Sequence, residues 1–154
     1  MKIIDYDDYE DLKEVTITSH ADLYTIPHDF EGTIYVDAPY FPVDIDRKRL
    51  SHLRHIVVVG TTVATVTNME IEARDHAKIY AHGAAIINAK NQVYVEASEG
   101  VCVNAEDNVH VDAKMFSHVH AKDNCSVYAT SFSKVFAKDK ALVAAKNDSL
   151  VFAD

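Results

Sequence analysis

Apolar and polar residues alternate along this chain in units of eight residues, from about Val59 to Asp154. Successive units read DHAKIYAH, GAAIINAK, NQVYVEAS and EGVCVNAE. Odd positions of each unit are apolar or small and even positions are mostly polar, which is the period of a β-strand with one buried face. The fifth position holds only valine or isoleucine: Val63, Ile71, Ile79, Ile87, Val95, Val103, Val111, Val119, Val127, Val135, Val143 and Val151. The seventh holds alanine in every unit from Ala73 onward. Such a short, fixed repeat predicts a solenoid.

A second period of sixteen residues predicts the size of one coil. The first position of alternate units is aspartate or asparagine: Asp75, Asn91, Asp107, Asp123 and Asp139. The intervening units mostly have other residues there: Gly83, Glu99, Met115, Ser131 and Asn147. Two units therefore make one coil with two distinct faces. Asp and Asn suit a corner because they tolerate turn conformations and bond to nearby backbone. Valine and alanine in place of larger core residues indicate a thin interior. We therefore predict an all-β, flattened, right-handed parallel β-solenoid with sixteen residues per turn and six turns between Val59 and Asp154.

Residues 1–58 do not follow the repeat and are expected to form an irregular N-terminal cap to the solenoid of residues 59–154. A short helix is predicted from Asp7 to Glu14, and strands over 15–18 and 33–37. The last unit, which ends at Asp154, carries no such cap. Because an open coil exposes unpaired strand edges, we expect either a homodimer through the C-terminal coil or continuation into a longer protein.

Net charge and composition narrow the classes of function. The chain of 154 residues carries a net charge of −9, and its acidic excess is greatest at the start, in Asp5, Asp7, Asp8, Glu10, Asp11 and Glu14. This acidic patch argues against nucleic-acid binding, which requires basic residues to neutralise phosphates. No apolar run is long enough to span a membrane. Two cysteines without a disulfide pattern favour a cytoplasmic location.

The repeat also resembles a known group of proteins. The motif V-x-A-x-(D/N/G)-x, preceded by the segment Ile26-Pro27-His28-Asp29-Phe30-Glu31-Gly32 and by Ile34, is similar to octapeptide-repeat proteins of phages, prophages and bacteria. The resemblance implies the solenoid architecture over nearly the whole chain. It implies no catalytic residues, and this chain has Asp and Asn where members of that group are rich in glycine.

Outward aromatic residues near the C-terminus are the strongest sign of a partner. Residues sixteen apart become neighbours in the coil, so Phe116 should stack on Phe132, and His120 on Phe136 and then Phe152. Together with Leu150 they form a predicted association surface. The alternative is that the rings form ladders that only stabilise the sheet.

Two clusters offer weaker hints of chemistry. Cys102, His118 and His120 could provide part of a zinc shell, although two ordinary surface histidines are the simpler interpretation. On the other face, Glu96 and Asp112 should be neighbours, flanked by residues that suit a glycosidase or lyase: Tyr94, His110 and Tyr128. A solvated carboxylate pair on a flat surface is the simpler interpretation, because catalytic sites need concavity.

Three functions follow from these observations. The first is a non-enzymatic, self-associating interaction protein, for example a phage or mobile-element accessory protein that binds and inhibits a host protein. The second is a structural segment of a larger tail or fibre assembly, and the third is a metal- or carboxylate-dependent enzyme. No cofactor is expected.

Overall fold

The computed structural model describes residues 14–154 as a β-solenoid built from two parallel β-sheets. Sheet A contains nine strands in the order β1 (Glu14–Ile17), β2 (Thr33–Val36), β4 (His55–Val58), β6 (Glu70–Ala73), β8 (Ile86–Ala89), β10 (Cys102–Ala105), β12 (His118–Ala121), β14 (Lys134–Ala137) and β16 (Leu150–Ala153). Sheet B contains seven, in the order β3 (Val43–Asp46), β5 (Val63–Thr67), β7 (Lys78–His82), β9 (Tyr94–Ala97), β11 (His110–Ala113), β13 (Ser126–Ala129) and β15 (Leu142–Ala145).

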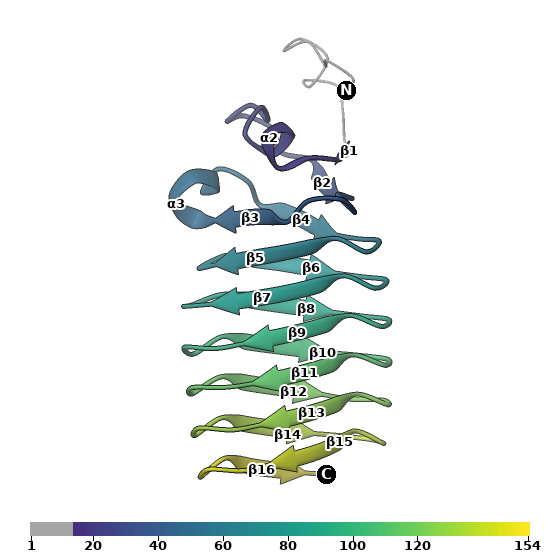
Figure 1. Cartoon of the computed structure of the whole chain (residues 1–154), viewed down its shortest axis with the longest axis vertical. Helices are drawn as coiled ribbons and strands as arrows, with labels where there is room; N and C mark the ends of the chain where they lie inside the picture. The colour runs from purple at the N-terminus through teal and green to yellow at the C-terminus, as the bar shows by residue number, and fades with distance from the viewer. Residues whose placement is uncertain (1–13) are drawn as a thin grey trace.

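From β2 onward the chain alternates between the two sheets and advances by one strand in each with every turn (Figure 1). As the chain descends in Figure 1, the front strands of sheet B run to the left and the rear strands of sheet A to the right, which is a right-handed coil. Val103 pairs with Val119 in sheet A, and Val111 with Val127 in sheet B. These pairs confirm the predicted sixteen-residue turn. The solenoid has about nine turns, because strands before Val59 join both sheets and add to the six turns predicted between Val59 and Asp154.

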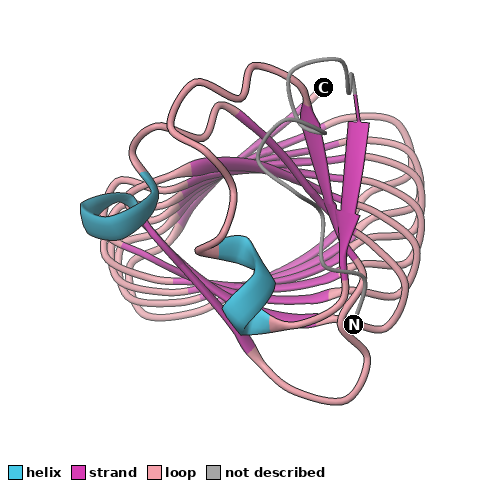
Figure 2. Ribbon diagram, turned by 90° about the horizontal axis from the view of Figure 1, so that it is seen from above, coloured by secondary structure: helices cyan, strands magenta, loops and turns pink. Residues whose placement is uncertain are grey.

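The core lies between the sheets and is thin because its inward residues are small. Val95, Ala97, Val103 and Ala113 are completely buried. Figure 2, which looks along the solenoid, shows the strands of the two sheets as two layers joined by loops at both edges. Valine and alanine fill this narrow space in a regular stack. The alternation of buried and outward positions also fixes which side chains can reach a partner.

The first predicted repeat unit is out of register by one residue. Val63 was expected to point inward, but Ala64 and Val66 are the buried residues of β5, and Val63 is only half-buried. Ala64 pairs with Ile79, fifteen residues later, so this coil is one residue shorter than those that follow. The apolar residues on both faces of this segment concealed the shift from a period-based prediction.

One corner of five successive coils is built on the predicted column of Asp and Asn. Asp75, Asn91, Asp107, Asp123 and Asp139 all have positive φ, between 58° and 66°. Side-chain oxygens of this column accept hydrogen bonds from backbone N–H groups one coil earlier, as Asp107 Oδ2 does from Asn91 N at 3.0 Å. Asp and Asn tolerate the left-handed conformation better than most residues do. The column therefore shapes the turn and also connects successive coils.

The segment before Val59 continues the solenoid in enlarged coils rather than standing apart from it. Strands β1 and β2 lie close to the two strands predicted there, while the loops between strands hold two one-turn helices, α2 (His20–Leu23) and α3 (Arg47–Leu50). In Figures 1 and 2, α2 lies across the N-terminal end of the interior, and its Leu23 is fully buried. The helix predicted over 7–14 falls outside the described residues except for Glu14, which begins β1. Over residues 14–154, no helix is long and apolar enough to cross a membrane.

Candidate interaction surface

Two stacks of aromatic rings stand on the outside of the C-terminal coils, as the sixteen-residue spacing predicted. His120 stacks on Phe136 with ring centroids 4.8 Å apart, and Phe136 stacks on Phe152 at 5.0 Å. All three project from the outer face of sheet A, from β12, β14 and β16. Phe116 and Phe132 form a second stack at 5.5 Å, on the corner that leads from sheet B to sheet A. The predicted neighbours are therefore confirmed as contacts.

The Phe116–Phe132 stack occupies a backbone conformation that is unfavourable for phenylalanine. Both residues have a φ of 63°, and they are 62% and 53% exposed. Gly100 and Asp148 occupy the same position of neighbouring coils, also at positive φ. The coil therefore does not require an aromatic residue here. A strained, exposed apolar residue is the kind of feature that marks a contact surface.

Exposed apolar side chains are concentrated in the C-terminal coils. Leu142 of β15 is 74% exposed, and Leu150 and Phe152 of β16 are each 50% exposed. Strands β15 and β16 are the outermost strands of their sheets and pair on one side only in this chain. Their row of unpaired backbone groups lies beside these apolar side chains. An unpaired edge with apolar side chains is well suited to pairing with another strand.

The three predicted zinc ligands lie on neighbouring strands, but their side chains are not arranged to hold a metal ion together. Cys102 and His118 are paired in register on adjacent strands, as expected. His120, however, packs its ring face against Phe136. Burial raises the pKa of the Cys102 thiol, which disfavours the thiolate that binds metal. Among residues 14–154, no group of three His, Cys, Asp or Glu side chains is placed to hold a metal ion.

The predicted carboxylate pair is present on sheet B, but other side chains engage both members. Glu96 and Asp112 are in register on adjacent strands. Lys114 Nζ lies 3.1 Å from a carboxylate oxygen of Glu96, and the hydroxyl of Tyr94 donates to Asp112 at 2.9 Å. Burial and this hydrogen bond to Asp112 raise the pKa of Tyr94, whose ring also stacks on His110. These contacts satisfy the carboxylates and explain the cluster as a stabilising network.

Two serine–histidine pairs were not singled out from the sequence, although their sixteen-residue spacing could have revealed them. The Nδ1 atom of His82 lies 2.8 Å from Ser98 Oγ, and that of His110 lies 2.6 Å from Ser126 Oγ. His82 ends β7 and Ser98 directly follows β9, whereas His110 and Ser126 begin β11 and β13. The two pairs therefore lie at opposite ends of the strands of sheet B, and each links two successive coils.

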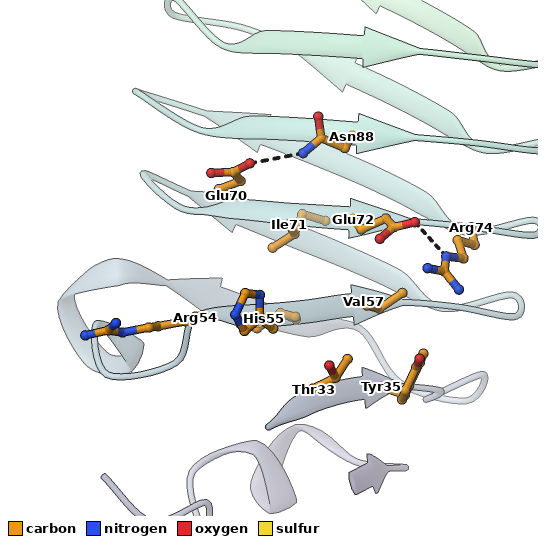
Figure 3. Close-up of a pocket in the computed structure, with 11 residues that line it drawn as sticks. Thr33, Tyr35, Arg54, His55, Val57, Glu70, Ile71, Glu72, Arg74 and Asn88 are labelled. Atoms are coloured by element: carbon orange, nitrogen blue, oxygen red, sulfur yellow. Dashed lines mark hydrogen bonds and ion pairs between the residues drawn. The ribbon is translucent and has the colours of Figure 1, made fainter. Parts of the chain in front are cut away.

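A hollow on the outer face of sheet A was also not foreseen. Its volume is about 360 Å³, and its lining includes Tyr35, His55, Glu70, Glu72 and Arg74 (Figure 3). Arg74 Nε donates to Glu72 at 2.7 Å, and this hydrogen bond lowers the pKa of Glu72. The pattern of repeats gave no signal for the hollow, because it lies where the repeat begins.

Most of the acidic patch predicted at the start of the chain precedes residue 14, the first residue that the structure describes. Asp5, Asp7, Asp8, Glu10 and Asp11 lie outside the described residues. Glu14 is an exposed residue at the start of β1.

Comparison of the chain with protein-family models, curated proteins and solved structures finds no match in any of the three. The resemblance to octapeptide-repeat proteins therefore stays a prediction.

Proposed function

We propose that this protein is a non-enzymatic interaction protein that self-associates through β15 and β16. The observation that carries this proposal is the coincidence of two unpaired strand edges with exposed Leu142, Leu150 and Phe152. Backbone pairing would satisfy the edge, and contact between the side chains would remove apolar surface from water. Both contributions favour association at the same place.

A two-fold symmetric pair would place two β16 strands antiparallel to each other, since symmetry reverses the direction of the second strand. Leu150 and Phe152 both project outward and are separated by one residue. Antiparallel pairing centred on Val151 therefore puts Phe152 of one copy beside Leu150 of the other, twice. The stack of His120, Phe136 and Phe152 would then contact Leu150 of the other copy. The edge of β16 is thus self-complementary.

The test is the native mass of the protein, measured by light scattering over a range of concentrations, for the wild type and for Phe152→Asp. We expect a wild-type dimer whose dissociation constant rises at least about tenfold in the variant, because a charge is placed in an apolar contact. Phe41→Asp is the matched control, since Phe41 is 73% exposed but lies in the loop before β3. That change should leave the mass unaltered.

Two results would count against the proposal. A wild type that stays monomeric at the highest concentration would remove self-association altogether. A dimer that survives Phe152→Asp but dissociates with Phe41→Asp would place the interface at the opposite end of the molecule.

A further inference from the structure

The unpaired edge of β16 has an aspartate at each end. Asp148 comes two residues before Leu150, the first residue of the strand, and Asp154 comes two residues after Phe152. Both side chains are exposed. Within residues 14–154, no ion pair includes either carboxylate. The edge therefore combines an apolar middle with a negative charge on either side.

Aspartate at these two places is a property of the last coil. Phe116 and Phe132 occupy the position of Asp148 in the two preceding coils, and Lys138 occupies the position of Asp154 one coil earlier. Both positions thus become acidic in the coil whose strand has the unpaired edge. Charged side chains on an edge strand oppose its pairing with another strand.

Two-fold symmetry brings these aspartates together if two copies associate as proposed above, and this inference rests on that proposal. In antiparallel pairing centred on Val151, opposite residues lie equally far from Val151 on its two sides. Asp154, three residues after Val151, then comes opposite Asp148 of the other copy, three residues before it. Symmetry repeats the contact. The interface therefore has a pair of like charges at each end and apolar residues between them.

The backbone keeps Asp154 in line with the strand. Its N–H donates to Ala137 O at 3.1 Å, so the hydrogen bonds with the preceding coil continue beyond Ala153. Asp154 and Phe152 are two residues apart and therefore project from the same face. Asp148 lies in the turn that leads into β16, at a φ of 60°. The two carboxylates thus stand just beyond the two ends of the apolar contact.

The lysines nearest to these aspartates do not cancel the repulsion. Lys134 pairs in register with Leu150, and Lys138 directly follows Ala137. Both belong to the preceding coil and are one coil farther from the other copy. Lys146 lies in the turn before β16, but its Nζ is 5.8 Å from the centre of the Tyr128 ring on sheet B. The aspartates are therefore the charged residues that come closest across the interface.

We propose that these two pairs of aspartates oppose self-association and make it depend on salt. At low ionic strength the carboxylates repel each other across the interface, because exposed charges so close together are little screened. Salt shortens the range of this repulsion to roughly 10 Å at 0.1 M, which allows the apolar middle of the edge to dominate. The dimer therefore tightens as salt is added, whereas a contact held by ion pairs loosens. The aspartates set how readily two copies combine rather than where they combine.

Charge reversal tests which residues face each other. At low salt, Asp148→Lys and Asp154→Lys should each lower the dissociation constant about tenfold, because each turns both repulsive pairs into attractive ones. The double variant should return to about the wild-type value, since lysine then faces lysine. Glu31→Lys makes the same change in net charge at an exposed residue in the loop before β2 and is the matched control. A double variant that associates more tightly than either single variant would show an effect of net charge alone and overturn the proposal.

The corner accepts these changes without loss of the fold. Phe132 has a φ of 63° at the position that corresponds to Asp148, so a long side chain is already tolerated there. Circular dichroism of each variant checks that the solenoid is intact. Asp148→Asn, which tolerates a positive φ well, removes the charge with the least change in shape and should also tighten the dimer.

Salt and mixing complete the test, with sedimentation and native mass spectrometry as the measurements. Added sodium chloride should tighten the wild-type dimer and loosen the dimers of the two single lysine variants. Wild type mixed with the double variant should form more heterodimer than random pairing gives, because every facing pair is then of opposite charge. A wild-type dimer that ignores salt and all these substitutions would leave self-association standing and refute only this inference. A chain that stays monomeric as wild type and as each single variant would refute both.

Discussion

A carboxylate oxygen of Asp123 accepts a hydrogen bond from the backbone N–H of Asp107, one coil earlier, at 3.2 Å. Asp107 does the same for Asn91, and its own carbonyl oxygen accepts from the N–H of Asn124 at 2.9 Å. Asp107 therefore connects its own coil both to the coil before it and to the coil after it. This double role explains why alternate units keep Asp or Asn at their first position.

Replacing Asp107 with alanine should destabilise the solenoid. The variant loses the acceptor for Asn91 N and puts alanine at a φ of 66°. We expect the free energy of unfolding to fall by about 1–2 kcal/mol, measured by denaturant titration. Asp107→Asn keeps an acceptor and tolerates the same φ, so it should change stability by less than about half as much. Equal losses in the two variants would mean that the side-chain oxygen is unimportant.

Two buried serines occupy equivalent positions, but we expect substitution by alanine to change the free energy of unfolding in opposite directions at the two sites. Ser117 and Ser133 are both fully buried, sixteen residues apart. Ser133 Oγ donates to Ala113 O at 3.0 Å and also contacts Thr130 O, whereas Ser117 Oγ has no hydrogen-bond partner among the described residues. Ser117→Ala should raise the free energy of unfolding by about 1 kcal/mol, and Ser133→Ala should lower it by a similar amount. Thermal unfolding of the two variants side by side checks the difference, and a loss in both would refute it.

The stacked corner phenylalanines should contribute little to stability. Asparagine at Phe116 and Phe132 relieves the strain of a positive φ, but it loses the ring contact. These effects are of similar size, so Phe116→Asn combined with Phe132→Asn should change the free energy of unfolding by less than about 1 kcal/mol. Chemical denaturation measures the result. A much larger loss would show that the rings hold the coil together.

The pair His28 and His52 should make the N-terminal coils sensitive to acid. Their ring centroids lie 4.1 Å apart, and burial, with repulsion from His28, lowers the pKa of His52. The unfolded chain then binds more protons than the folded one below a pH of about 6.5. The free energy of unfolding should therefore be highest above that pH and fall as the pH drops through it. His52→Gln should flatten this slope, and His28→Gln should flatten it in part, as followed by stability measurements at several pH values.

The repeat predicted the fold because a sixteen-residue period leaves little choice of architecture. The stacking of His120 on Phe136 followed directly from the same period, since each residue is placed by counting. The register of Val63 was predicted wrongly because apolar residues stand on both faces of β5 and only tertiary pairing selects between them.

The hollow and its charges could not be predicted for a related reason. They depend on which residues of β4 stay unpaired with β6, and a periodic pattern does not indicate this. The charged residues Glu70 and Arg74 look like ordinary outward residues of the sequence until the strands part beside them.

The strands of both sheets lie across the long axis of the molecule, so the hydrogen bonds between them run along it (Figure 1). A solenoid with this arrangement resists stretching and bending, because separating two coils would break several hydrogen bonds at once. From β6 to β16 the sheet advances by five strands, or roughly 24 Å at the usual strand spacing. The solenoid is therefore rigid, and a partner that paired with β16 would be held at a constant distance from the side chains of β6.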